Sequence, residues 1–331
     1  MVFLKDVAKL AEVSMMTVSR AINKPDKLKK ETLARVQDAI RKTGYTPDLS
    51  ARMIRSTRSG QGPRTIGVLA LDTATSPFCV DIILSVEETA RSYGWNSYIV
   101  NMLAEDNPES IADLLLSHRP DGIIFTTMGL RQVEISGRML KVPLVLANCE
   151  SVNTSTASYI PDDENGQYDA VSALLKAGRR RPLCLYLPAE HPATARRIRG
   201  LTRAFRDYGE DTENLLHHYL SDEHYADIPD VVRRYIRHGK PEFDSVICGN
   251  DRIAFIVYQI LLACGLNIPA DVAVTGYDNM VGIGGLFIPP LSTVQLPHYE
   301  IGRQSALHII NGETHRDTVC ISSPWLSRAS V

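Results

Sequence analysis

Four polar residues stand directly after short apolar segments that have the composition of buried strands. The four are Asp72 after residues 65–71, Asn148 after 143–147, Asn250 after 245–249 and Asp278 after 272–277. Ligands of open α/β sheets bind beyond the carboxyl ends of the strands, so we expect these side chains to line one cleft. Carboxylates and amides form the paired hydrogen bonds that the hydroxyl groups of a polyol offer. The pattern therefore indicates a site for a small polyhydroxylated molecule.

The sequence lacks the short motifs that carry common enzymatic chemistry. It contains no G-x-S-x-G, no H-E-x-x-H and no G-x-x-x-x-G-K-[ST], and the glycine cluster at 282–285 does not follow a strand as a dinucleotide loop would. The nine histidines show no metal-ligand spacing, and the six cysteines are scattered singly, which is typical of reduced, buried thiols. We therefore predict no catalysis, no cofactor and no metal site.

Charge is divided unevenly along the 331 residues. Residues 1–60 carry 13 Lys and Arg against 6 Asp and Glu, a net charge of +7, and the remaining residues carry a net charge of −9. A basic head on an acidic body predicts that the head contacts a polyanion, the alternative being a solvated basic face. No apolar run reaches the roughly 18 residues of a membrane helix. Charges near the start argue against a signal peptide, so we expect a cytoplasmic protein.

Hydrophobic periodicity changes along the chain. Residues 1–45 have the pattern of short helices, and residues 56–63, rich in Gly, Ser and Gln, have the composition of a linker. Beyond it, seven short apolar runs alternate with amphipathic stretches of helix length. The runs are 65–71, 97–100, 122–126, 143–147, 182–187, 245–249 and 272–277, and the helical stretches are 81–93, 108–118, 164–177, 195–208 and 251–264. This alternation predicts parallel sheets covered by helices, and its length predicts two lobes.

Residues 4–23 predict a helix-turn-helix. Val7, Ala8 and Leu10 are apolar at helical spacing, and Ser14 stands where its hydroxyl can cap a second helix. A tight turn between two short helices lets the second lie in the major groove of DNA. A three-helix bundle with no DNA role is the alternative. In the DNA-binding interpretation, Met15, Met16 and Thr17 face the bases, followed by Ser19 and Arg20.

Residues 4–23 of the head resemble the LacI/GalR repressor family, whose signature is D-V-A-x-x-A-x-V-S-x-x-T-V-S-R-x-x-N. Glu12 departs from the usual Gly of the turn and predicts strain there if a positive φ is required. Residues 44–56 are similar to the hinge segment of the family, with Asp48 in place of Asn and Ile54 in place of Leu. The resemblance implies that Ile54 wedges into the minor groove and that the arginines of the hinge contact phosphates. The predicted DNA-binding residues are Ser14, Met15, Met16, Thr17, Ser19, Arg20, Asn23, Ser50, Arg52 and Ile54.

The body resembles the effector domain of the same family, which is similar to periplasmic sugar-binding proteins. That resemblance implies two α/β lobes joined by three crossings, expected near residues 158–163, 288–293 and 316–321. It implies that Phe78 contacts the ligand and that Arg197 is the effector-binding arginine, with His191 nearby. The predicted effector-binding residues are Asp72, Phe78, Asn148, His191, Arg197, Asn250 and Asp278.

The fold class expected is thus an all-α helix-turn-helix head followed by a two-lobed α/β effector domain with parallel sheets. The expected head spans residues 1–46, the hinge and linker 47–62, and the effector-binding and dimerisation domain 63–331. Its first lobe covers about 63–160 and 293–317, and its second about 161–290 and 320–331. A palindromic double-stranded operator and a homodimer follow from the short reach of one helix-turn-helix.

The sequence alone leaves the identity of the ligand open. Strings such as SMMTVSR, DTATSPF and QLPH are most similar to family members that control sucrose use, so a glucosyl-fructose or fructose effector is the hypothesis. A purine or phosphosugar that acts as a corepressor is one alternative. A sugar-binding protein of a transport system is a second, which the basic head disfavours. A sugar- or nucleotide-using enzyme is a third, disfavoured by the missing motifs.

Overall fold

The computed structural model describes residues 2–23, 25–45, 64–73, 80–212, 215–221, 225–280 and 283–331. The chain divides into two units, residues 1–63 and residues 64–331. The described part of the first unit is helical, and the second unit is built on two main sheets.

The first unit contains α1 (Leu4–Leu10), α2 (Met15–Asn23), the 3-10 turn η1 (Pro25–Lys27) and α3 (Lys30–Thr43). Apolar side chains at helical spacing meet in one small core, which comprises Val7, Ala8, Ala11, Val18, Ala21, Val36 and Ala39. α3 ends where Gly44 adopts a φ of +65°, a left-handed cap that suits a residue without Cβ.

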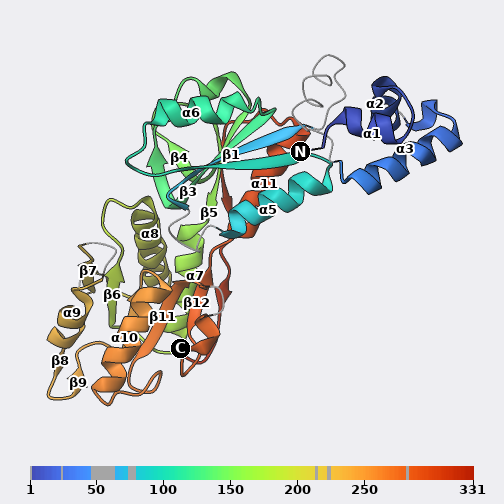
Figure 1. Cartoon of the computed structure of the whole chain (residues 1–331). Coiled ribbons are helices and arrows are strands. Elements are labelled where there is room, and N and C mark those ends of the chain that lie inside the picture. The colour runs from blue at the N-terminus through green and yellow to red at the C-terminus, as the bar shows by residue number, and fades with distance from the viewer. Residues whose placement is uncertain are drawn as a thin grey trace. The chain divides into compact units, whose positions relative to one another are not determined.

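The first lobe of the second unit is a six-stranded parallel sheet in the order β13-β5-β4-β3-β1-β2. Its strands are β1 (Thr65–Leu71), β2 (Asn96–Met102), β3 (Gly122–Val133), β4 (Leu144–Ser151), β5 (Ala157–Pro161) and β13 (Thr318–Ile321). α5 (Val80–Ser92) and α11 (His298–Asn311) cover one face, and α6 (Pro108–Ser117) with the turn η4 (Met139–Lys141) covers the other (Figure 1). Burial on both faces explains why the runs of β1, β3 and β4 are apolar throughout.

The second lobe is a six-stranded sheet in the order β14-β12-β11-β10-β6-β7, parallel except for β14. Its strands are β6 (Pro182–Tyr186), β7 (Leu216–Tyr219), β10 (Ser245–Cys248), β11 (Ala273–Asp278), β12 (Ser292–Gln295) and β14 (Trp325–Leu326). α7 (Asp163–Lys176) and α8 (Pro192–Asp207) pack on one face, and α9 (Ile228–Arg234) and α10 (Asp251–Ala263) on the other. A hairpin of β8 (Ile236–Arg237) and β9 (Lys240–Pro241) and the turn η5 (Gly284–Leu286) complete the lobe.

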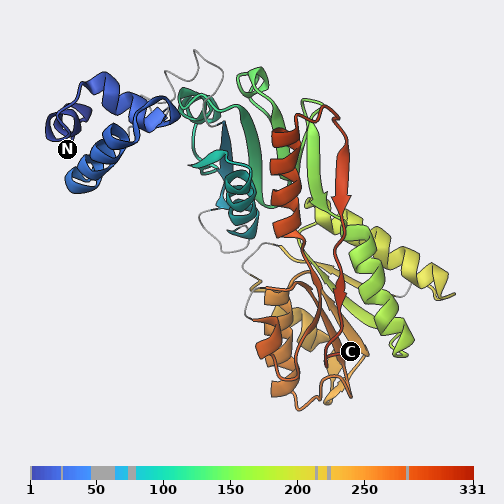
Figure 2. The ribbon, with the colours of Figure 1, turned by 90° about the vertical axis from the view of Figure 1, so that its right-hand side faces the viewer.

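Three connections join the lobes, and β5 and β13, which lead into two of them, pair side by side (Figure 2). The first connection follows β5, inside the expected range. β12 still belongs to the second sheet and β13 to the first, so the other two lie near 296–297 and 322–324, after the ranges expected. β12 and β13 are short and contain polar residues, so hydropathy alone does not identify them as strands. The helical head and the two lobes with parallel sheets confirm the predicted fold class.

Candidate DNA-binding surface and ligand pocket

The predicted recognition helix α2 presents its first residues to solvent. Met15 is 56% exposed and Met16 71% exposed, whereas Val18 is fully buried in the head core. Arg20 is exposed and Ser19 is half-buried. These two methionines are not part of the head core, and this end of α2 is open to solvent.

The turn before α2 is held by Ser14. Its Oγ accepts a hydrogen bond from the backbone N–H of Thr17 at 3.1 Å and lies 3.0 Å from the hydroxyl of Thr17. Glu12, in the same turn, has a φ of +53°. The turn therefore does require the positive φ that we expected to cause strain at this position. A residue with a Cβ adopts this left-handed conformation at an energetic cost.

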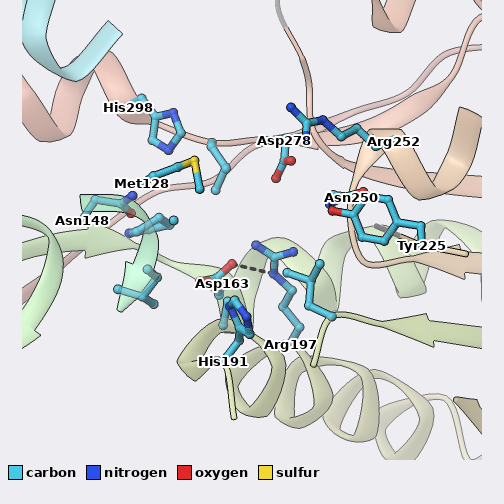
Figure 3. A pocket seen from close by; sticks show the side chains of 16 residues that line it. Met128, Asn148, Asp163, His191, Arg197, Tyr225, Asn250, Arg252, Asp278 and His298 are labelled. Atoms are coloured by element: carbon cyan, nitrogen blue, oxygen red, sulfur yellow. Dashed lines mark hydrogen bonds and ion pairs between the residues drawn. The ribbon is translucent and has the colours of Figure 1, made fainter. Parts of the chain in front are cut away.

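A pocket lies between the two lobes of the second unit (Figure 3). The first lobe contributes Met128, Asn148, Pro161 and His298, and the second contributes Asp163, His191, Arg197, Tyr225, Asn250, Arg252 and Asp278, among others. Five of the predicted effector residues thus meet around one cavity: Asn148, His191, Arg197, Asn250 and Asp278. Most of them stand at strand ends or helix starts, where the topology of the two sheets brings them together.

Arg197 is fixed at the floor of this pocket by three contacts. Its Nε donates to Asp163 Oδ1 at 2.8 Å, its Nη1 donates to the carbonyl of Gly249 at 2.6 Å, and its guanidinium lies 3.4 Å from the ring centre of Tyr277. Burial is the largest single influence and lowers the pKa of Arg197, but Asp163, Tyr277 and Asp278 together outweigh it and raise that pKa above its ordinary value. The arginine is a permanent cation in a preset orientation.

Two asparagines are held by the backbone around them. Asn148, with a φ of +61°, is buried and donates to the carbonyl of Thr127 at 3.3 Å. Asn250 caps α10 by accepting from the N–H of Ile253 and donates to the hydroxyl of Tyr225 at 2.7 Å. These bonds orient both amides at the pocket wall.

Asp72 has a different environment. Its carboxylate forms an ion pair with Arg131 at 2.7 Å and accepts from the N–H of Ala104 at 3.1 Å. It does not line the pocket between the lobes. Asp72 thus stands at the carboxyl end of β1, as predicted, but its side chain is bound by Arg131 on β3 and does not reach the pocket.

Comparisons with known proteins bear on both units. Residues 3–48 match the model of bacterial regulatory proteins of the lacI family, and residues 64–329 match that of periplasmic binding proteins and sugar binding domains of the LacI family. The sucrose operon repressor of Escherichia coli is 49% identical over 333 residues, which cover both chains fully. The chain belongs to the LacI family.

Solved structures of LacI-family proteins share the fold. The lac repressor dimer bound to operator and an anti-inducer aligns with a TM-score of 0.80 at 21% identity, covering 99% of this chain and 98% of the other. A transcriptional regulator in complex with cellobiose aligns with a TM-score of 0.68 at 23% identity, over all of both chains. This LacI-family chain is a DNA-binding transcriptional repressor that responds to a sugar.

Several pocket residues of this LacI-family chain escaped the sequence reasoning. Asp163 stands two positions after β5 and begins α7, but residues 157–161 do not have the apolar pattern of the predicted strands, so the sequence does not mark Asp163 as a strand-end residue. Arg252 follows Asn250 by two positions and had the same signal. Tyr225, His298 and Met128 carry no signal in the sequence, because they reach the pocket from a turn, a helix start and a strand bend.

Some predicted residues lie outside the described part of the chain. They are Ser50, Arg52 and Ile54 of the predicted hinge, and Phe78. The backbone of Asn23 ends α2, and its side chain is also outside the described atoms. None of the described helices is both long and apolar enough to cross a membrane.

Proposed function

We propose that this repressor controls an operon for sucrose use, and that it leaves its operator when sucrose or fructose occupies the pocket between the lobes. The observation that carries the proposal is the meeting of Arg197, Asp278, Asn148 and Asn250 around one cavity. The name of its 49% identical relatives points to sucrose.

The chemistry of the pocket suits a sugar. Arg197 offers donors, Asp278 offers acceptors and the two amides offer both, which matches the paired hydroxyls of a furanose or pyranose ring. The second carboxylate oxygen of Asp163 is buried and has no hydrogen-bond partner among the described residues. A ligand hydroxyl would satisfy that acceptor.

The cavity is small in this conformation. Its volume is about 120 Å³, below the roughly 300 Å³ at which small-molecule sites usually begin. Admission of a disaccharide therefore requires the lobes or the lining side chains to move. Such a movement is what links ligand binding to the DNA-binding state, because a ligand shifts only an equilibrium between states for which it has different affinities.

On the DNA side, we infer that α2 enters the major groove. Met15 and Met16 lack strong donors, so they contact thymine methyl groups, while Ser14, Thr17, Ser19, Arg20 and Asn23 contribute polar contacts. Ser50, Arg52 and Ile54 of the hinge contribute phosphate and minor-groove contacts.

A homodimer provides two such heads for a palindrome. Leu286 and Ile288 are 75% and 83% exposed, and both flank Phe287, whose ring packs edge-on against Phe255 and Tyr258 of α10. Phe255 is itself half exposed. These side chains form one apolar face, which a second copy of the chain would cover.

Calorimetry with the full chain and a panel of sugars tests the effector. We expect sucrose or fructose to bind and Asp278→Asn to weaken that binding at least tenfold. The exposed Asp169→Asn on α7 is the control and should bind as the wild type does. Tight binding of a purine or a phosphosugar, with none of sucrose or fructose, would refute the proposed effector.

A further inference from the structure

A second group of chemically capable side chains lies in the first lobe, away from the pocket between the lobes. His308 is on the last turns of α11, and Glu313 and His315 are in the loop that leads to β13. One ligand atom from each lies within 4.8 Å of the other two. Across the described ranges, this is the one group of His, Cys, Asp and Glu side chains placed to hold a metal ion.

The spacing of the donor atoms is that of a metal coordination shell. Glu313 Oε2 lies 3.2 Å from His315 Nε2 and 3.6 Å from His308 Nδ1. A tetrahedral zinc ion with bonds of about 2.0–2.1 Å holds its ligand atoms about 3.3 Å apart. The hydroxyl of Tyr159 on β5 lies 3.2 Å from each of the two imidazole nitrogens and is therefore near enough to act as a further ligand.

The surroundings also fit such a site. The side chain of His308 is only 6% exposed, and those of Glu313 and His315 are 39% and 33% exposed, so the group is shielded yet reachable. A pocket of about 510 Å³, lined by all three residues, opens beside it. The other ring nitrogen of His315 is buried, has no hydrogen-bond partner among the described residues, and lies 3.9 Å from the carboxylate of Asp317.

We propose that His308, Glu313 and His315 bind one divalent transition-metal ion, with the Tyr159 hydroxyl or a water molecule as the fourth ligand. Two imidazoles and one carboxylate are a donor set that zinc accepts, and the spacing matches its tetrahedral preference. The ion ties the end of α11 and the following loop to β5. β5 and β13 lead at their carboxyl ends into two of the connections between the lobes, and the ion would brace this pair of strands from the amino end of β13.

The test uses untagged full-length protein that has been dialysed against a chelator. Zinc chloride is titrated by calorimetry, and cobalt(II) is added separately to read the absorption bands of tetrahedral coordination. We expect one zinc per chain, tetrahedral cobalt bands and a melting temperature that rises with zinc. His315→Gln and Glu313→Gln should each weaken zinc binding more than tenfold and abolish the bands; both positions are half exposed, so the variants fold.

His238→Gln, which removes an exposed histidine elsewhere in the chain, is the control and should leave all three readouts unchanged. Absence of zinc binding by the wild type at micromolar metal would overturn the proposal. So would equal binding by the wild type and both cluster variants, because the ion would then bind elsewhere.

Discussion

The ion pair of Arg197 with Asp163 lies at the proposed ligand site and also bears on the stability of the fold. Both side chains are almost fully buried, at 7% and 1% exposure. Removal of one partner leaves an uncompensated charge in the interior, which destabilises by about 3–5 kcal/mol. A simple alanine substitution at Arg197 therefore tests folding before it tests ligand recognition.

Arg197→Ala is expected to lower the free energy of unfolding by about 3–5 kcal/mol. Arg199→Ala on the same helix removes an exposed ion pair with Glu164 and should change it by less than about 1 kcal/mol. Thermal melts of both variants provide the comparison. Similar melting temperatures would show that the buried pair contributes no more than the exposed one.

Asp278 makes a pH-dependent contribution to the free energy of unfolding. Enclosure in the pocket raises its pKa well above the ordinary value of 3.8, against the attraction of Arg197. A carboxyl with a raised folded-state pKa contributes its full stability below the ordinary pKa, and that stability is lost as the pH rises through the folded-state value. At neutral pH, ionisation of Asp278 therefore lowers the free energy of unfolding.

Asp278→Asn should accordingly raise the melting temperature at pH 7–8 by about 2–4 °C, the shift that corresponds to roughly 1 kcal/mol in a domain of this size. The gain should shrink as the pH falls towards 4. Melts across this pH range check it, with Asp169→Asn as the control. A variant that is less stable than the wild type at pH 8 would contradict the assignment.

At the scale of elements, the crossing of α7 and α8 positions the ion pair. A Cβ at Gly200 would lie 2.1 Å from the backbone carbonyl oxygen of Glu164, which cannot rotate away. Only glycine lets the two helices approach so closely, and that approach places Asp163 beside Arg197.

Gly200→Ala is expected to destabilise the protein by about 1–3 kcal/mol through overpacking and to weaken sugar binding as α8 shifts. Gly137→Ala is the matched control, since a Cβ there meets no atom within 4 Å. Melting curves and calorimetry report the two effects. Equal stability of the two variants would show that α8 adjusts freely.

The predictability of the elements follows from their burial. All seven apolar runs that we predicted as strands fall on β1, β2, β3, β4, β6, β10 and β11, which lie in the interior or are long. The strands that escaped prediction are β5, β7, β8, β9, β12, β13 and β14, which are short, and several are at sheet edges where polar residues are tolerated. Residues such as Asp163, which depend on a missed strand, were missed with it.

The grouping of His308, Glu313 and His315 could not be predicted from the sequence for a related reason. His308 and His315 are seven positions apart, and the seven-residue interval is spanned partly by a helix and partly by a turn at Gly312. No linear spacing rule describes that path, so only the fold brings the three side chains together.

At the scale of the whole effector unit, an ion pair between described residues bridges the lobes. Arg196 on α8 donates to Glu150 on β4 at 2.7 Å, and both side chains are about one-fifth exposed. A pair at this position favours the conformation with the small cavity. Its loss should favour the more open conformation, and so ease entry of the ligand.

Glu150→Gln is expected to increase the association rate of the sugar about 2- to 5-fold, the factor that corresponds to roughly 0.5–1 kcal/mol for a partly exposed pair. Stopped-flow measurement gives the rate. Glu109→Gln, which removes an exposed ion pair with Arg138 within the first lobe, is the control. Identical rates for all three proteins would show that the pair does not restrain the lobes.

In the proposed mechanism, a sugar in the pocket between the lobes changes the affinity of the repressor for DNA. The most direct measurement is fluorescence anisotropy of the full chain with an operator obtained by selection from random sequence, at one fixed salt concentration because phosphate contacts make affinity salt-dependent. We expect tight binding that sucrose or fructose reverses in the wild type but not in Asp278→Asn. An operator affinity that no sugar changes, or one that falls equally in both proteins, would contradict it.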